Sequence, residues 1–208
     1  MTENAASASG PVSGASWSDP AGLRQALQAL YAGREQHLKA AFDRSLPFAD
    51  AVLDNRWERA RRLGFGEGSS IYDTAIVFGE VVVGHQTWIG PGVILDGSGG
   101  SLRIGSFCSI SAGVHIYTHD TVRWALSGGL APQHVGPVRI GDCCHIGAQS
   151  IVIAGVEIGE KCVVAANSFV NRNVLARTIV GGSPARLLGR VVGDGVDIEL
   201  VFDEEKGP

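Results

Sequence analysis

Residues 140–174 read IGDCCH-IGAQSI-VIAGVE-IGEKCV-VAANSF-VNRNV, a segment that repeats every six residues. Each repeat begins with a β-branched aliphatic residue: Ile140, Ile146, Val152, Ile158, Val164 and Val170. Four residues later stands a small or branched residue: Cys144, Ser150, Val156, Cys162, Ser168 and Val174. A period of six fits neither an α-helix nor an alternating strand. Repeats of this length are typical of a parallel β-helix.

One aliphatic and one small residue of each hexad should face inward, and three hexads should make one coil, for about five coils in all. Stacking is required because a single hexad buries too little apolar surface to offset its ordering entropy. We expect Ile146 to stack on Val164, eighteen residues later. Small residues in the second hexad position are expected to serve the sharp turns at the corners: Gly141, Gly147, Gly159 and Ala165.

The same pattern begins earlier in the chain, at Ile71, and is disturbed at two places. The glycine-rich stretch 96–101 indicates an insertion of three residues before the pattern resumes at Ile104. A longer interruption, YTHDTVRWALSGGLAPQHVGP, covers residues 117–137. Long loops on a rigid scaffold are usually functional. This loop holds three features that a scaffold does not need: His119-Asp120, Arg123-Trp124 and His134.

Composition places the chain among globular proteins with one main domain. The net charge is −4 without a block of basic residues, which argues against nucleic-acid binding. No apolar run approaches membrane-spanning length, and the first residues do not form a secretory signal, so a cytoplasmic location is expected. We predict four regions: a disordered start at 1–18, a helical lead-in at 19–68, the β-helix domain at 69–187, and an extension at 188–208 with a possible hairpin about Asp194-Gly195.

Cysteine and histidine positions give no sign of a metal site. Three of the four cysteines (Cys108, Cys144 and Cys162) take the small inward position of a hexad, which favours the core, and we expect them to be reduced. The γ-type carbonic anhydrases bind zinc on a β-helix through three histidines. Here His85, His115 and His119 lie at inconsistent hexad phases. We therefore expect no metal ion.

The chain resembles the hexapeptide-repeat acyltransferases over residues 69–190. The resemblance rests on the hexads, the loop histidine, the restart PVRIGDCCHIGA at 137–148 and the closing GGSPAR at 181–186. It is strongest for the branch of galactoside, maltose and Nod-factor O-acetyltransferases, which includes polysaccharide-associated sugar acetyltransferases. It implies an all-β fold, a left-handed parallel β-helix, with a short helical lead-in and an irregular tail. It also implies a homotrimer with acetyl-CoA in the clefts between subunits.

The resemblance also assigns roles to residues. His119, with the neighbouring carboxylate Asp120, would be the base, because a neutral imidazole can take the proton of a weakly nucleophilic hydroxyl. The acceptor would lie against Arg123, Trp124, His134 and His145, the last in place of the family's usual tryptophan. Backbone groups and cations for acetyl-CoA would come from Ala148, Ala166, Asn171, Arg172, Arg186 and Arg190. Asn171-Arg172 replaces the usual Thr-Lys pair, and Gly189 stands where the family often has a second basic residue.

The expected reaction is acetyl transfer from acetyl-CoA to a hydroxyl or amino group of a sugar, such as a surface-polysaccharide or nucleotide-sugar precursor. One alternative is a xenobiotic O-acetyltransferase that modifies antibiotics, although the aromatic acceptor pattern and the loop of that class are not seen. Another is a non-catalytic trimeric scaffold, against which the loop histidine and the GGSPAR segment argue. Binding of CoA would separate a transferase from a scaffold.

Overall fold

The computed structural model describes residues 19–53 and 55–203. The segment 1–18, expected to be disordered, lies outside the described residues. The chain divides into two compact units, Met1–Leu53 and Asp54–Pro208, and each is described by itself. The division falls inside the range 19–68 that the sequence suggests as a helical lead-in.

The first unit contains the helix α1 (Pro20–Phe42) and a short π-helix, η1 (Ala49–Leu53). Asp19 caps α1 by accepting a hydrogen bond from the Gly22 amide at 3.0 Å, as the Asp-Pro start predicts. The Tyr31 hydroxyl donates to the Leu46 carbonyl at 2.7 Å, which ties the following segment back onto the helix. Among the described residues, no helix combines the length and apolar character that crossing a membrane requires.

The second unit opens with α2 (Arg56–Arg62). Its N-cap is Asn55, whose side chain accepts from the amides of Trp57 and Glu58. The sequence pattern suggests one helix from Val52 to Leu63. The structure shows a break instead, because the Asn55 cap starts a new helix. The Arg59 guanidinium donates to the carbonyls of Tyr72 and Ala75, which anchors α2 on the first turn of the repeat.

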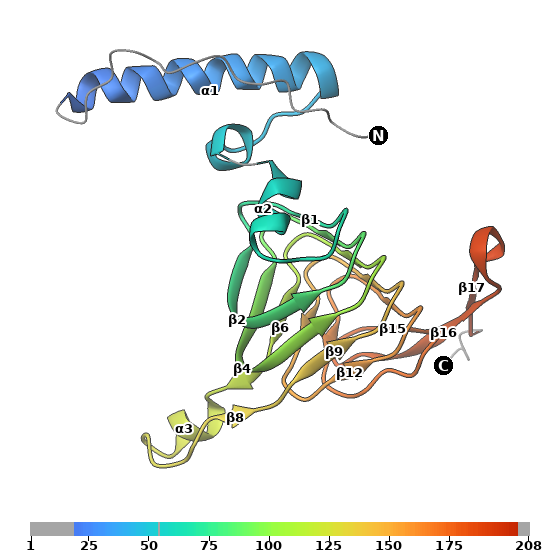
Figure 1. Cartoon of the computed structure of the whole chain (residues 1–208). Helices are drawn as coiled ribbons and strands as arrows, with labels where there is room; N and C mark the ends of the chain where they lie inside the picture. The colour runs from blue at the N-terminus through green and yellow to red at the C-terminus, as the bar shows by residue number, and fades with distance from the viewer. Residues whose placement is uncertain (1–18, 54, 204–208) are drawn as a thin grey trace. The chain divides into compact units, whose positions relative to one another are not determined.

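The repeat forms stacked parallel strands on three faces (Figure 1). The first face contains β1 (Ser70–Ile71), β3 (Trp88–Ile89), β5 (Ser109–Ile110), β10 (His145–Ile146), β13 (Val163–Val164) and β15 (Thr178–Gly181). The second contains the first halves of β2 (Ile76–Val83) and β4 (Ile94–Ile104), with β6 (His115–Tyr117), β11 (Ile151–Val152) and β14 (Phe169–Val170). The third contains the second halves of β2 and β4, with β9 (Val138–Ile140) and β12 (Glu157–Ile158).

The hexad register predicted from the sequence is confirmed. Ile146 pairs with Val164 in parallel register, and successive turns begin at Ile71, Ile89, Ile110, Ile146 and Val164. These inward side chains are almost completely buried and form one continuous core. The fold is therefore a parallel β-helix, in which each turn covers the apolar side chains of its neighbours.

The expected reason for the second-position glycines is wrong. Positive φ angles occur at the fourth hexad position instead, at residues such as Cys143, Gln149 and Lys161. A Cβ atom on Gly147 would lie only 2.5 Å from the Ala166 amide nitrogen on the next turn. Glycine is needed there because successive turns approach closely, and not because the backbone turns sharply.

Both disturbances of the repeat lie at the corner between the second and third faces. Gly79 of β2 pairs with Gly97 of β4, but Val81 pairs with Leu102, so the register shifts by three residues as predicted. Residues 117–137, here called the arm, leave the β-helix at the same corner one turn later. The arm contains β7 (His119–Asp120), α3 (Val122–Leu126) and β8 (His134–Val135), and β7 and β8 pair antiparallel. Figure 1 shows α3 projecting beyond the ends of β4 and β8.

A hairpin follows the last turn, at the place that Asp194-Gly195 suggests. The strand β16 (Arg186–Val192) pairs with β15 and with β17 (Glu199–Phe202), and η2 (Gly195–Asp197) forms the connection. The Asp194 carboxylate contacts the Lys161 ammonium group and the Arg177 guanidinium, the latter at 2.6 Å. These two cations lower the pKa of the Asp194 carboxyl group and fasten the hairpin to the β-helix.

The inward cysteines form a column along the corner that precedes the first face, as their hexad positions predict. Cys108, Cys144 and Cys162 are buried on successive turns. The Cys144 thiol donates to the Gly159 carbonyl at 3.0 Å, and the Cys162 thiol donates to the Leu175 carbonyl at 3.0 Å. Contacts with the neighbouring thiols, together with burial, raise the pKa of the Cys144 thiol. This thiol therefore stays neutral and acts as a core group.

We expect Cys162→Ser to change the free energy of unfolding by less than about 1 kcal/mol, because the hydroxyl would keep a carbonyl partner. The equivalent inward hydroxyl of Ser150 donates to the Ala165 carbonyl at 2.9 Å. Cys162→Leu should instead cost about 1–3 kcal/mol, because it overfills the coil. Urea denaturation of both variants tests this, and equal losses for Ser and Leu would contradict it.

Candidate active site

The centre of the candidate site is His119, at the base of the arm. Its Nδ1 atom lies 3.3 Å from Oδ2 of Asp96 and 3.4 Å from Oγ of Ser98. The His119 side chain is 28% exposed, whereas the Asp96 side chain is only 8% exposed. A buried carboxylate beside a partly exposed imidazole can orient the ring and determine which ring nitrogen carries the proton.

Several hydrogen bonds hold Asp96 in place. Its Oδ1 atom accepts from the Ser98 amide at 2.9 Å and from the Ser98 hydroxyl at 2.5 Å. Its carbonyl accepts from the Thr118 hydroxyl at 2.8 Å, and this hydroxyl in turn accepts from the Gly99 amide at 3.0 Å. A Cβ atom on Gly99 would lie 2.5 Å from Cβ of His119. The three-residue insertion is thus built to bring a carboxylate under the histidine of the next turn.

Sequence reasoning missed Asp96 and placed Asp120 beside the histidine. In the structure Asp120 turns to the other side of the arm, where its Oδ2 atom lies 3.0 Å from Nδ1 of His134. Its Oδ1 atom accepts from the Val122 amide at 3.0 Å and so starts α3. Adjacent residues of a strand point to opposite faces, which explains why sequence neighbours do not meet. The signal available for Asp96 was a carboxylate at the start of the glycine-rich insertion.

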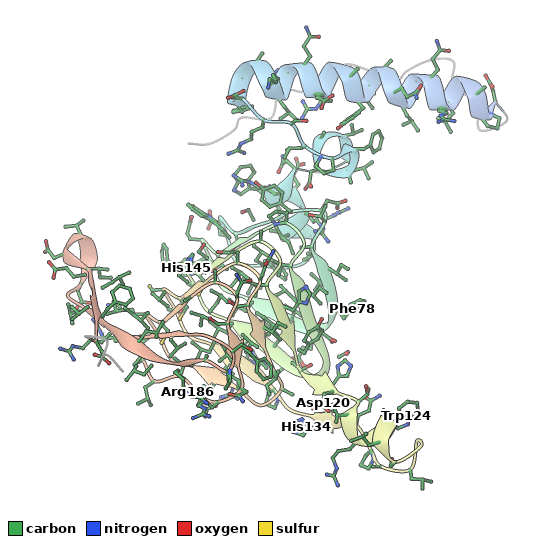
Figure 2. All side chains as sticks on the ribbon, turned by 180° about the vertical axis from the view of Figure 1, so that it is seen from behind. Phe78, Asp120, Trp124, His134, His145 and Arg186 are labelled. Carbon is green, nitrogen blue, oxygen red and sulfur yellow. The ribbon has the colours of Figure 1, made fainter. Side chains whose placement is uncertain are left out.

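The remaining acceptor-site candidates do not all gather near His119. Figure 2 shows Asp120, Trp124 and His134 on the arm, and His145 at a separate place on the β-helix. Arg123 and Trp124 belong to α3, which has no buried residue. His145 is exposed on the first face, where its strand pairs with β5 and β13. Within one chain, Asp120, Trp124 and His134 thus share the arm, whereas His145 lies elsewhere on the β-helix.

The acetyl-CoA candidates occupy two corners on either side of the second face. Ala148 and Ala166 are neighbours on successive turns, since the Asn167 amide donates to the Ala148 carbonyl at 2.9 Å. Arg186 begins β16 opposite Gly181, near the end of the same corner, and Arg190 lies farther along this strand, opposite Thr178. Asn171 and Arg172 are exposed at the other corner, two turns after the arm leaves from it.

Within residues 19–53 and 55–203, no group of three or more His, Cys, Asp or Glu side chains is arranged to hold a metal ion. The arm base presents an imidazole, its carboxylate partner and the hydroxyl group of Ser98.

Comparison with known proteins links this architecture to acyl transfer. The sequence signature described as "Hexapeptide repeat of succinyl-transferase" matches residues 137–172. The chain is 31% identical to chloramphenicol acetyltransferase of Morganella morganii over 125 residues, or 50% of this chain and 58% of that protein. The chain thus spans little more than half the length of this relative.

Two solved structures are similar as well. A hexapeptide-repeat-containing acetyltransferase of Vibrio cholerae matches with a TM-score of 0.56 and 26% identity, over 79% of this chain and 92% of that chain. Its complex with acetyl coenzyme A matches with a TM-score of 0.50, over 82% and 90% of the two chains. A mutant of AntD, an N-acyltransferase of Bacillus cereus in complex with dTDP and coenzyme A, matches with a TM-score of 0.50 and 25% identity, over 64% and 88%.

The stacked hexads define a repeat protein of the β-helix class. The chain carries the hexapeptide repeat of this signature over residues 137–172, and it is similar in sequence and fold to hexapeptide-repeat acetyltransferases.

Proposed function

We propose that the protein transfers an acetyl group from acetyl-CoA to a hydroxyl or amino group of a sugar. The observation that carries this proposal is His119 at the base of the arm, with Asp96 behind its Nδ1 atom. The complexes of the Vibrio cholerae protein with acetyl coenzyme A and of AntD with dTDP and coenzyme A support it. Within the family, the arm and the GGSPAR segment favour the galactoside, maltose and Nod-factor branch.

In this mechanism Asp96 holds a proton on Nδ1, which leaves Nε2 of His119 free to act as the base. Nε2 takes the proton of the acceptor while the acceptor oxygen or nitrogen bonds to the thioester carbonyl carbon. The carbon–sulfur bond then breaks, and the imidazolium returns the proton to the departing thiolate. No acyl-enzyme is needed, because the thioester is already activated.

We further propose that the β-helix is left-handed and that the protein is a homotrimer with sites between subunits. The second face presents Ile76 and Ile151, which are 46% and 37% exposed. The arm presents Leu126 and Leu130, which are 85% and 90% exposed. Apolar patches of this kind mark contact surfaces. A neighbouring copy would also bring the arm of one subunit to the Ala148–Ala166 corner of another. The free thiols favour a cytoplasmic setting.

The side chains and backbone groups at the cofactor candidates match the chemical groups of CoA. Ala148 and Ala166 are small, and Ala148 is partly exposed and Ala166 exposed, so the backbone groups of their corner are accessible to an amide-containing chain such as pantetheine. Arg172 and Arg186 are exposed cations, and guanidinium groups are well suited to phosphate oxygens.

We expect Arg186→Ala and Arg172→Ala to raise the KM for acetyl-CoA about tenfold and to lower kcat much less, because they remove phosphate contacts that persist throughout the reaction. The matched control is Arg139→Ala, an exposed arginine of the third face whose strand neighbour is Glu157. Steady-state kinetics with varied acetyl-CoA measures the effect. An increase confined to the acceptor's KM would count against these positions.

The test of the function is a turnover screen that follows release of the CoA thiol. The acceptors are free hexoses, hexosamines, nucleotide-linked amino sugars and chloramphenicol. Sugar turnover is expected. Turnover of chloramphenicol alone would support the xenobiotic function that the Morganella morganii relative suggests. A thermal shift with CoA separates either acetyltransferase from a non-catalytic scaffold, because only a protein that binds CoA gains stability as the CoA concentration exceeds its Kd. No shift and no turnover would refute the proposal.

A further inference from the structure

An exposed phenylalanine lies one strand away from Asp96, the carboxylate that contacts the candidate base. Phe78 of β2 is the register neighbour of Asp96 on the preceding turn, and Tyr117 is its neighbour on the following turn. Neighbouring parallel strands are about 4.8 Å apart. Phe78, Asp96 and Tyr117 therefore form one column at the edge of the second face, with the carboxylate between two aromatic residues.

The three members of this column are exposed to different degrees. Asp96 is only 5% exposed, because the arm and Ser98 cover it. Tyr117 is half-buried, and its hydroxyl lies 3.2 Å from Nδ1 of His115. Phe78 is 50% exposed, so a large part of this residue faces solvent. Figure 2 shows Phe78 on the flank of the β-helix from which the arm leaves.

Charged and polar side chains of this part of the β-helix have partners, with the exception of one atom, Nε2 of His119. Glu80 and Arg103 form an ion pair at 3.4 Å on the neighbouring face. Asp96 and Ser98 both lie at Nδ1 of His119. Among the described residues, both polar contacts of the His119 ring are therefore made by Nδ1. The Nε2 atom of this ring remains available to a reactant. The site thus combines an exposed apolar ring, one strand away from Asp96, with a His119 nitrogen that is available to a reactant.

We propose that Phe78 is the stacking platform for the pyranose ring of the acceptor and determines which acceptors are used. This inference rests on the proposed function. A pyranose has one face rich in C–H groups, which suits an aromatic ring, while its hydroxyls remain at the rim. Stacked on Phe78, the sugar would direct a rim hydroxyl or amino group toward Nε2 of His119. Phe78 thus contributes to orientation and acceptor affinity, and not to proton transfer.

The occupant is a sugar rather than a second copy because of where Phe78 lies. The aliphatic residues that suit a subunit contact, such as Ile76 and Ile151, lie within the second face. Phe78 lies at its edge, in register with the buried carboxylate of the candidate site. An interface role remains a distinct outcome of the test, because it predicts a change in assembly.

The kinetic test compares Phe78→Ala, Phe78→Trp and Phe107→Ala. Phe107 is the matched control, since it is 59% exposed on the same β-helix but packs on His85, with ring centroids 4.9 Å apart. With the best sugar of the screen, Phe78→Ala should raise the acceptor's KM about tenfold and leave the KM for acetyl-CoA unchanged. Phe78→Trp should restore the affinity, and Phe107→Ala should stay within about twofold of the unmodified protein. An unchanged acceptor KM in Phe78→Ala overturns the inference.

A binding measurement keeps the inference separate from the proposed function. Saturation-transfer NMR with the methyl glycosides of glucose, galactose and mannose needs no turnover. We expect saturation transfer from the protein to the C–H protons of the sugar ring. This transfer should be lost in Phe78→Ala and kept in Phe107→Ala. If turnover occurs but no transfer depends on Phe78, the inference fails while the proposed function stands. If Phe78→Ala changes the sedimentation of the protein, Phe78 is a subunit contact and the inference is wrong.

Discussion

His119→Ala should lose turnover by about 10²–10⁴-fold, which is the usual contribution of a general base. The variant should fold normally, because the His119 ring lies at the base of the arm and outside the buried core. Asp96 would keep both hydrogen bonds from Ser98 after the ring is removed. Binding of acetyl-CoA should be preserved, since no cofactor candidate contacts this ring. Kinetics and a CoA thermal shift measure the two properties independently.

The pH dependence provides a second test of the same role. Only the neutral imidazole can accept a proton, so kcat/KM of the unmodified protein should rise as the pH is raised through the titration of the base. This rising limb should disappear in His119→Ala. It should also be absent in His119→Asn, because an amide keeps polarity but cannot take the proton.

His134 provides the comparison within the arm. Its Nδ1 atom lies 3.0 Å from Oδ2 of Asp120, whereas His119 is the partner of Asp96. As an acceptor-site candidate, His134→Ala should affect the acceptor's KM and should retain the rising pH limb. If His134→Ala were inactive while His119→Ala kept near-normal kcat, the base would have to be reassigned to His134.

The β-helix could be predicted in detail because one chemical requirement recurs on every turn. The inward positions of a coil accept only residues of limited size, so Ile146 and Val164 reveal their stacking by spacing alone. The insertion before Ile104 was visible for the same reason, as a shift in phase. The glycines show what spacing alone cannot reveal. Their pattern was clear, but whether a positive φ or the close approach of successive turns demands glycine depends on the neighbouring coil.

The site could be predicted only in part because it is assembled by contacts between turns. The interruption of the repeat, together with the family resemblance, pointed to His119, whose catalytic role stays a prediction. Its carboxylate partner comes from the previous turn, and sequence proximity favoured Asp120 instead. The break between η1 and α2 was missed in a similar way, because the local cap at Asn55 outweighed the apolar spacing on either side.

Asp96 is the position where two substitutions should differ most informatively. Its Oδ1 atom is fixed by the Ser98 amide and hydroxyl, and its Oδ2 atom lies toward Nδ1 of His119. In Asp96→Asn the amide oxygen should remain with the two Ser98 donors. The amide NH₂ group would then face Nδ1 of His119. A donor at this place stabilises the tautomer with its proton on Nε2, which is the wrong form for a base.

We therefore expect Asp96→Asn to lower kcat about 10²–10⁴-fold, in the range known for a mispositioned tautomer. Asp96→Ala should lose less activity than Asp96→Asn, because it removes the orienting group without imposing the wrong tautomer. The KM for acetyl-CoA should be unchanged in both. The ¹⁵N shifts of the His119 ring at neutral pH report the tautomer directly and should show Nδ1–H in the unmodified protein and Nε2–H in Asp96→Asn. A purely structural role would lower stability in both variants and leave the tautomer unchanged. Equal kcat in Asp96→Asn and the unmodified protein would remove Asp96 from the mechanism.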